Sequence, residues 1–363
     1  MPGTIAIEFN ESAIKIAEGR RKGNTLDLVK LQIIPTPSGV IKDERLQGQN
    51  AADILKKYLT EQYFSASKSL FTRNVTAVVS PASAITRQLL LPLTADSSIA
   101  SMVKYELKEF FPSSADEYII RHKNLGEAPE AGGVKKMRIF AAALPRQIVE
   151  DYYYFCESLK LKPSAMSINC ETAQKVFELC GTINGLELSK FNTVALLDIG
   201  FSCSHLHILK NCRTEMSNVI GLGEKHIIEA VAAGFDIPVD EAAAEFDKFG
   251  SLAVRRTDLD ASEQQKHIDA LNNIIRNNVD VLVEEARQIL AYYTSRTIGY
   301  NIEHVFAYGD ALSVNGLDAY VASGLNIQVT RVDHIGGIKV NGALERQRNM
   351  FKFVNVIGAL ISS

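Results

Sequence analysis

A strand-turn-strand pattern occurs twice in this sequence and constrains its fold more than any other feature. The first copy is IAIEFNESAIKIA, in which apolar residues alternate up to Phe9 and the chain turns at Asn10-Glu11. The second copy is VALLDIGFSCSHLHIL, in which Asp198 aligns with Glu8. The repeat predicts one fold used twice, an inference that needs support from the rest of the chain because strand-turn-strand segments are common.

Length and composition describe a globular protein. A chain of 363 residues predicts two or three folding units at about 100–200 residues per domain. Hydrophobic residues make up 46 % and charged residues 22 %, which excludes a disordered, collagen-like or coiled-coil chain. The 39 Lys and Arg residues nearly balance the 42 Asp and Glu residues, so bulk attraction to nucleic acid or acidic lipid is not expected.

Two features predict a cytoplasmic protein. The N-terminal segment reaches Glu8 and Glu11 before any apolar run long enough for a signal peptide, and no window approaches the ~20 apolar residues of a membrane helix. The five cysteines are widely spaced and lack the short paired spacing of a zinc site. We therefore expect reduced, mostly buried thiols at Cys156, Cys170, Cys180, Cys203 and Cys212.

The first half of the chain predicts a lobe with an inserted subdomain. After the hairpin, the pattern predicts a strand at 26–34, a helix from Asn50 and a strand at 75–80. The expected α+β insertion then holds strands at 85–91, 118–122 and 138–143, helices at 98–111 and 146–159, and an exposed turn at 127–133. A helix after Cys170 leads on to the second copy of the hairpin.

The second half repeats the opening and then becomes helical. We expect a third strand at 213–218 and helices at 227–233 and 239–246 after a glycine loop. A polar connection at 255–266 precedes a long helix at 274–296, and a strand at 304–308 runs into Gly309. A closing strand is expected at 326–331, and the segment 354–360 is short and apolar.

The second hairpin carries residues suited to holding a phosphate. Asp198 ends a strand and is followed by Gly200, Ser202 and Ser204. Glycine lets backbone amides approach phosphate oxygens, and a carboxylate can hold a metal ion through water. An ordinary tight hairpin with a solvated aspartate explains the same residues, and both interpretations stay open from the sequence.

A metal site can be imagined on the same hairpin. Cys203, His205 and His207 alternate, which would put all three on one face of a strand. No carboxylate or further histidine lies nearby in the sequence, so hydrogen-bonded strand residues are the simpler interpretation.

The order of hairpin, insertion, second hairpin, glycine loop, long helix and strand-glycine turn resembles that of the actin-like ATPases. Two segments, AITRQLLLPLTADSSIASMVKYELKEFFP and RIFAAALPRQIVEDYYYFCESLKLKPSAMSIN, look like the family of the pilus assembly protein PilM, a relative of the cell-division protein FtsA. The similarity covers nearly the whole chain and is most specific over 84–172. It implies an α/β, actin-like (ribonuclease H-like) fold of two lobes with duplicated halves.

The resemblance also implies domain boundaries and a nucleotide site. Residues 1–83 and 163–190 would form the first lobe, 84–162 the inserted α+β subdomain of the FtsA/PilM type, and 191–363 the second lobe. ATP and magnesium would lie between the lobes, with Asp198 holding the magnesium ion through water. The cofactor-binding positions that the resemblance carries over are Glu8, Asn10, Ser12, Lys15, Asp198, Gly200, Ser202, Gly221, Gly223 and Gly309.

Two parts of this implied site depart from the family's pattern. The first phosphate motif of the family is Asp-x-Gly followed by Ser residues, but this chain has Glu8, Asn10 and Glu11. A side chain at Asn10 crowds the phosphates and a carboxylate at Glu11 repels them. The adenosine turn carries Tyr308-Gly309-Asp310 in place of a run of glycines. These departures imply weakened ATP binding and little or no ATP hydrolysis.

One catalytic candidate follows from the implied site. Glu171, on the segment that links the lobes, is the position to inspect for a role in orienting a water molecule. A carboxylate in the first turn of a helix, favoured there by the helix dipole, is the alternative interpretation.

For function, the resemblance implies a cytoplasmic scaffold of the type IV pilus, or of a related type II secretion-like, inner-membrane assembly platform. The chain would bind the N-terminal cytoplasmic tail of a PilN-like membrane protein in a groove of the first lobe. Its membrane contact would be indirect, through that partner. Pilus motor ATPases and a second copy of the chain are further implied partners, whereas nucleic acid is not one.

Partner-binding candidates lie on the insertion. Exposed aromatic side chains dominate the energetics of many interfaces, so Tyr105, Phe110 and Phe111 are the candidates, with burial in the subdomain's own core as the alternative for Phe110. The contrasting function is an active ATP-hydrolysing protein, either a filament former similar to FtsA or a sugar kinase or chaperone relative. The first phosphate motif argues against that alternative.

Overall fold

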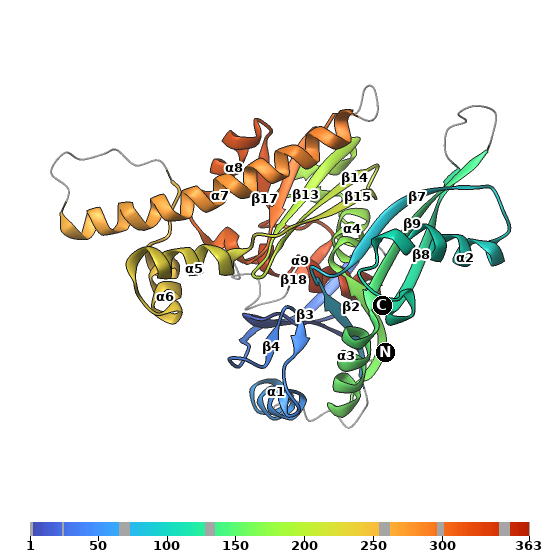
Figure 1. The fold of residues 1–363 in the computed structure, drawn as a ribbon, viewed down its shortest axis with the longest axis horizontal. Coiled ribbons are helices and arrows are strands. Elements are labelled where there is room, and N and C mark those ends of the chain that lie inside the picture. Colours follow the sequence, from blue (N-terminus) through green and yellow to red (C-terminus); the bar gives the residue numbers. More distant parts are fainter. Residues whose placement is uncertain are drawn as a thin grey trace.

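The computed structural model describes residues 3–23, 25–64, 73–127, 135–253, 262–295, 301–340 and 349–362. Two α/β lobes are each built on one sheet, and a smaller three-stranded subdomain lies beside them (Figure 1). Short elements in the connections are β4 (Ile41–Lys42), β5 (Arg45–Leu46), β11 (Thr182–Ile183), β12 (Leu186–Glu187) and single turns of helix at Thr60–Phe64, Leu188–Lys190, Asp310–Ser313 and Met350–Lys352.

The first lobe contains a six-stranded sheet in the order β10-β6-β1-β2-β3-β18. Its strands are β1 (Thr4–Glu8), β2 (Ala13–Lys22), β3 (Thr25–Pro35), β6 (Asn74–Val79), β10 (Lys162–Ile168) and β18 (Ile338–Val340). Helices α1 (Ala51–Leu59) and α3 (Arg146–Ser158) pack on one face, where Phe9 stacks on Tyr152 with ring centroids 4.5 Å apart. Ala6 points to the other core, as the predicted alternation requires.

The second lobe contains a five-stranded sheet in the order β15-β14-β13-β16-β17. Its strands are β13 (Thr193–Ile199), β14 (Ser204–Lys210), β15 (Arg213–Ile220), β16 (His304–Tyr308) and β17 (Val329–Arg331). Its helices are α5 (Glu224–Phe235), α6 (Val239–Phe249), α7 (Glu263–Ser295) and α8 (Leu317–Leu325). The linking helix α4 (Asn169–Leu179) contacts β15 and β10, so it packs against both lobes.

The two hairpins occupy equivalent places in their sheets. In the first lobe, Glu8 pairs with Lys15 across the hairpin and with Val78 on a parallel strand. In the second, Asp198 pairs with His205 across the hairpin and with Tyr308 on a parallel strand. This matching register confirms the predicted duplication.

The inserted subdomain is a three-stranded antiparallel sheet with one helix and a core of its own. Its strands β7 (Ile85–Pro92), β9 (Lys136–Pro145) and β8 (Tyr118–Glu127) lie in the order β7-β9-β8. Helix α2 (Asp96–Glu106) ends before the predicted end at 111, because the chain tightens into a single 3-10 turn at Lys108–Phe110. A second such turn, Ala115–Glu117, leads into β8. The predicted turn at 127–133 lies outside the described residues except for Glu127.

Other elements also differ from their predicted bounds. Helix α7 begins at Glu263, inside the stretch expected to be a polar connection. Glu, Gln and Lys are good helix formers, so the polar residues at the start of α7 form a solvent-exposed face of the helix. At 33 residues the helix is about 50 Å long. The closing strand β17 is shorter than expected and begins at Val329.

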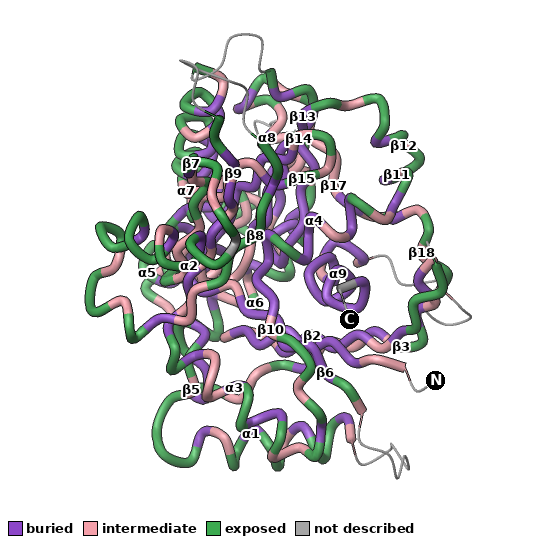
Figure 2. Tube along the Cα trace, turned by 90° about the vertical axis from the view of Figure 1, so that its right-hand side faces the viewer, coloured by how far each residue is buried: buried purple, intermediate pink, exposed green. Residues whose placement is uncertain are grey.

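The last part of the chain returns from the second lobe to the first. Strand β18 joins the first sheet beside β3, although residues after 191 were assigned to the second lobe. Helix α9 (Val354–Ser362) contacts α4, β1 and β2 and lies buried beside α4 (Figure 2). Its apolar surface therefore packs inside the protein. Within the described residues, no helix combines the length and apolarity needed to cross a bilayer.

The cysteines follow the prediction. All five are free; Cys156, Cys170, Cys180 and Cys203 are buried and Cys212 is half-buried.

Candidate functional site

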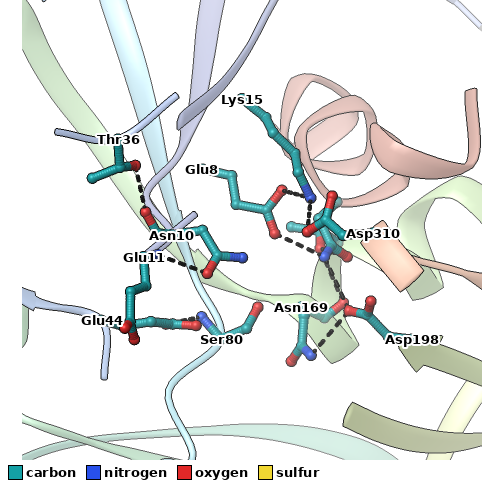
Figure 3. A network of polar contacts seen from close by, with 12 residues as sticks. Glu8, Asn10, Glu11, Lys15, Thr36, Glu44, Ser80, Asn169, Asp198 and Asp310 are labelled. Atoms are coloured by element: carbon teal, nitrogen blue, oxygen red, sulfur yellow. Dashed lines mark hydrogen bonds and ion pairs between the residues drawn. The ribbon is translucent and has the colours of Figure 1, made fainter. Parts of the chain in front are cut away.

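The turns of the two hairpins meet at a small polar cavity between the lobes (Figure 3). Its volume is about 10 Å³, close to the minimum that one water molecule needs. The structure brings together six of the residues predicted from the repeat and the resemblance, Glu8, Asn10, Lys15, Asp198, Gly200 and Ser202. The cavity is lined by Glu8, Asn10, Lys15, Glu44, Ser80, Asp198, Gly200, Phe201, Ser202, Cys203, His205 and Asp310.

Lys15 connects the first lobe to the second across this cavity. Its Nζ atom lies 3.0 Å from Asp310 Oδ2 and 3.6 Å from Glu8 Oε2. All three side chains are buried. Burial opposes the charge on Lys15, but Asp310 and Glu8 together raise its pKa above the ordinary range. The ammonium group is therefore charged and its charge is already neutralised within the protein.

Asn355 of α9 joins the two hairpin carboxylates. Its Nδ2 atom donates to Glu8 Oε1 at 3.0 Å and to Asp198 Oδ2 at 3.1 Å. Asn169, at the start of α4, adds a longer bond of 3.5 Å to the same Asp198 oxygen. Both donors lie on helices between the lobes, and Figure 3 shows Asn169 facing Asp198.

Burial raises the pKa of three carboxyl groups of this cavity, those of Asp198, Glu8 and Glu44. Desolvation and the charge of Glu8 raise the pKa of Asp198 to about 7. Burial also raises the pKa of Glu8, against the opposing charge of Lys15. Glu44 is buried with the backbone N–H of Ser80 at 2.5 Å as its donor, and burial raises its pKa well above the usual value.

A second set of polar contacts closes the outer side of the cavity. Lys225 Nζ lies 2.9 Å from Glu11 Oε1, and Ser202 Oγ donates to Glu11 Oε2 at 3.4 Å. The Asn10 side chain accepts a hydrogen bond of 2.8 Å from the backbone N–H of Glu11. Asn10 is therefore engaged within the turn, whereas the Glu11 carboxylate is engaged with Lys225 and Ser202 of the second lobe.

The start of α5 is also engaged with the second hairpin. The backbone N–H groups of Glu224 and Lys225 donate to the carbonyls of Gly200 and Phe201, each at 3.0 Å. A Cβ at Gly223 would lie 2.3 Å from the Phe201 oxygen, so a glycine is needed for this approach. Helix N-terminal N–H groups are frequent phosphate ligands, but these two already have carbonyl partners.

These residues do not fit a nucleoside triphosphate in the observed arrangement. Ligand pockets of that size class measure about 300–1,000 Å³, against about 10 Å³ here. Of the described residues lining the cavity, Lys15 alone carries a cationic side chain at neutral pH, since burial lowers the pKa of His205 to about 4. Glu8, Glu44, Asp198 and Asp310 contribute acidic groups.

The remaining predicted cofactor residues lie around the cavity without lining it. The carbonyl of Ser12 accepts a bond of 3.0 Å from the Thr36 N–H. Gly221 and Gly223 form the turn between β15 and α5. Gly309 has a φ of 111°, and a Cβ there would lie 2.4 Å from the Ile199 oxygen. The need for glycine at 309 thus comes from the approach of β16 to β13.

Glu171 lies in the first turn of α4, where it is exposed, and it does not line the cavity. Its neighbour Asn169 is the residue of that turn whose side chain reaches Asp198. A catalytic role for Glu171 stays a prediction.

The alternating residues of the second hairpin are buried. The rings of His205 and His207 stack with centroids 5.9 Å apart, and His207 Nδ1 lies 2.9 Å from Ser217 Oγ. Cys203 Sγ lies 3.9 Å from His205 Nε2. In the part of the chain that the structure describes, no group of three or more His, Cys, Asp or Glu residues is arranged to hold a metal ion.

Sequence reasoning missed three residues of the site. Asn355, Asn169 and Glu44 carry no motif, and they reach the cavity from α9, α4 and the β4–β5 turn. A polar residue within the apolar segment 354–360 was the available signal for Asn355, because a buried amide requires partners.

The partner-binding candidates lie on one side of the insertion. Tyr105 is 75 % exposed and Phe110 is 41 % exposed, with Arg87 4.3 Å above the Phe110 ring. Phe111 is half-buried against Tyr118, at 4.7 Å between ring centroids. Phe110 also lines a groove of about 1670 Å³ between the insertion and the second lobe. Tyr105 and Phe110 are therefore accessible, whereas Phe111 belongs mainly to the subdomain core.

The arrangement of two duplicated lobes around a hairpin cleft defines an actin-like protein, as solved structures confirm. The chain superposes on the ethanolamine utilization protein EutJ from Carboxydothermus hydrogenoformans with a TM-score of 0.57, 10 % identity and coverage of 100 % of this chain and 90 % of that one. MreB 5 of Spiroplasma citri bound to AMPPNP matches with a TM-score of 0.55, 9 % identity and coverage of 99 % and 96 %.

Within this class, the chain belongs to the family of the type IV pilus assembly protein PilM, whose family model matches residues 6–358. The solved PilM-PilN type IV pilus biogenesis complex matches with a TM-score of 0.78 and 18 % identity, covering 99 % of this chain and 98 % of that one. The expected fold class and family are thereby confirmed.

Proposed function

We propose that this chain is a cytoplasmic scaffold of a type IV pilus assembly platform, peripheral to the inner membrane, that binds the N-terminal tail of a PilN-like membrane protein. The observation that carries the proposal is the family match over nearly the whole chain, including the insertion. The similarity to a PilM-PilN complex supports the choice of partner. Contacts with pilus motor ATPases and self-association stay predictions.

The insertion offers a surface suited to such a tail. Tyr105 and Phe110 provide exposed aromatic area, and Phe110 lines the groove. Aromatic side chains anchor many peptide interfaces. Glu106 and Glu109 line the same groove and are exposed. The groove is also lined by Arg87, Arg138, Lys210 and Arg213, so its charge is mixed. Glu106 and Glu109 are two exposed carboxylates that can pair with the Lys and Arg residues that cytoplasmic segments next to membrane helices carry in excess.

Nucleotide has at most a minor role in the proposed scaffold. Relatives of this fold include an AMPPNP-bound protein, but the cavity between the hairpins is small and rich in carboxylates. We infer that ATP and magnesium bind weakly and are hydrolysed slowly, because phosphoryl transfer depends on positioning and charge stabilisation. Turnover near the enzyme median of about 10 per second would contradict the proposal.

The test is a binding titration of the full chain with a synthetic peptide of the cytoplasmic N-terminal residues of the PilN-like protein. We expect saturable binding that weakens with salt and falls at least about tenfold in Tyr105→Ala. Tyr154→Ala is the matched control, because Tyr154 is also exposed but lies on α3. Absence of binding by the unmodified chain would contradict the proposed partner. Equal binding by Tyr105→Ala and the unmodified chain would show that Tyr105 does not contact the peptide.

A further inference from the structure

We propose that the ion pair between Lys15 and Asp310 holds the two lobes closed in place of a bound nucleotide, and that Asp310 is the residue that excludes phosphate from this cleft. The proposal extends the weak nucleotide binding proposed above and is independent of the pilus partner. The carboxylate of Asp310 occupies the position beside Lys15 that an anionic ligand would need.

The first argument is the placement of the pair. Lys15 belongs to β2 of the first lobe and Asp310 follows β16 of the second, and their charged atoms are 3.0 Å apart. Lys15 is 3 % exposed and Asp310 is 7 % exposed. Breaking such a buried pair leaves an uncompensated charge in a poorly solvated place. Opening the cleft therefore requires both groups to be hydrated together.

The second argument is that a phosphate has no other cation to bind inside the cavity. Among the described residues that line it, Lys15 is the sole ammonium or guanidinium group. A phosphate entering the cavity would have to displace Asp310 and would then face Glu8 and Asp198. The phosphate would repel either carboxylate that is ionised and would favour its protonated form, in addition to the burial that already raises both pKa values.

The third argument is that three backbone donors near the cavity already have partners as well. The N–H groups at the start of α5 donate to Gly200 and Phe201. Gly309 N–H donates to the Phe351 carbonyl at 3.0 Å. These three amides, of Glu224, Lys225 and Gly309, thus have partners within the chain.

The fourth argument is that further contacts between the lobes support closure. Glu11 and Lys225 pair at 2.9 Å on the outer side. Asn355 joins Glu8 of the first hairpin to Asp198 of the second. Together with the Lys15–Asp310 pair, these contacts connect both hairpins on the inner and outer sides of the cavity without any ligand.

The test uses Asp310→Asn, which keeps the size of the side chain and removes its charge. Titration with MgATP, and separately with magnesium-free tripolyphosphate, should give no saturable binding to the unmodified chain at millimolar ligand. The variant should gain affinity of at least about tenfold for one or both ligands. Adding Lys15→Met to Asp310→Asn should abolish the gain, because the ammonium group supplies the attraction.

Three results would overturn the proposal: micromolar binding of MgATP by the unmodified chain, no gain in Asp310→Asn, or a gain that persists without Lys15. Circular dichroism and peptide binding establish that the variants are folded. The two proposals can fail separately. If the peptide does not bind, the partner is wrong, but the nucleotide titrations of Asp310→Asn still test the role of the ion pair.

Hydrogen exchange on the unmodified chain provides a test that needs no variant. The exchange rates of the amides of Asn10 to Ser12 and Gly200 to Ser202 should be the same without nucleotide and with millimolar MgATP. Rapid exchange that MgATP slows would show that nucleotide closes the cleft, contrary to the proposal.

Discussion

Gly358 of α9 lies so close to Thr172 of α4 that a Cβ at position 358 would be 1.9 Å from the Thr172 carbonyl oxygen. Helix α9 also contacts β1 and β2, and α4 contacts β15. The pair of helices therefore joins the first sheet to the second, and its packing depends on the absence of a side chain at 358.

Gly358→Ala should destabilise the protein. The added methyl group has to push α9 away from α4, which disturbs a tightly packed core and costs about 1–3 kcal/mol. Urea denaturation would measure the change. Gly181→Ala is the matched control, since no atom lies within 4 Å of the Cβ position there. Equal stability of the two variants would contradict the contact.

Asn355→Leu should reduce stability more at pH 8 than at pH 5. The amide donates to both Glu8 and Asp198, and its hydrogen bonds lower the pKa of each carboxyl against the effect of burial. Its loss leaves two buried acceptors short of a donor, at a cost of about 1–3 kcal/mol. That cost is greatest when both groups are ionised. A pH-independent difference in unfolding free energy would argue against this role.

Asp198→Asn should raise the unfolding free energy above that of the parent, and by more at pH 8 than at pH 4. Burial, followed by the charge of Glu8, raises the folded pKa of Asp198 from 3.8 to about 7. The folded state thus binds the proton more tightly, so Asp198 lowers stability as pH rises from 3.8 to about 7. The variant lacks this loss, so its unfolding free energy at pH 8 should exceed that of the parent by more than about 1 kcal/mol. Denaturant midpoints at the two pH values provide the check, and a smaller advantage at pH 8 than at pH 4 would refute it.

His205→Gln should weaken the acid sensitivity of the fold. Burial lowers the folded pKa of His205 from 6.5 to about 4, so the unfolded chain takes up the proton first. Stability from this group is present above pH 6.5 and is lost as pH falls from 6.5 toward 4. The variant should lose less stability between pH 7 and pH 5 than the parent. His122→Gln, at an exposed position on β8, should behave as the parent does.

Local patterns in the sequence determined the two hairpins and the insertion. Alternating apolar residues around Glu8 and Asp198 specify strands, because neighbouring side chains on a strand point to opposite faces. The same reasoning placed most strands of the insertion. It placed element ends less well, as at α2 and the start of α7, because polar residues extend a solvated helix as readily as they form a loop.

Only the tertiary structure decided how the cleft is filled. Lys15 meets Asp310 across 295 residues of sequence, and Asn355 meets Asp198 across 157. No periodicity records such a contact, since each depends on how two sheets and the returning helix α9 pack together. The sequence by itself determined two hairpins with acidic residues and an inserted subdomain. The positions of Asn355 on α9 and of Asp310 after β16 decided that a cavity of only about 10 Å³ remains between those hairpins, because buried charges must find partners wherever the folded chain brings them.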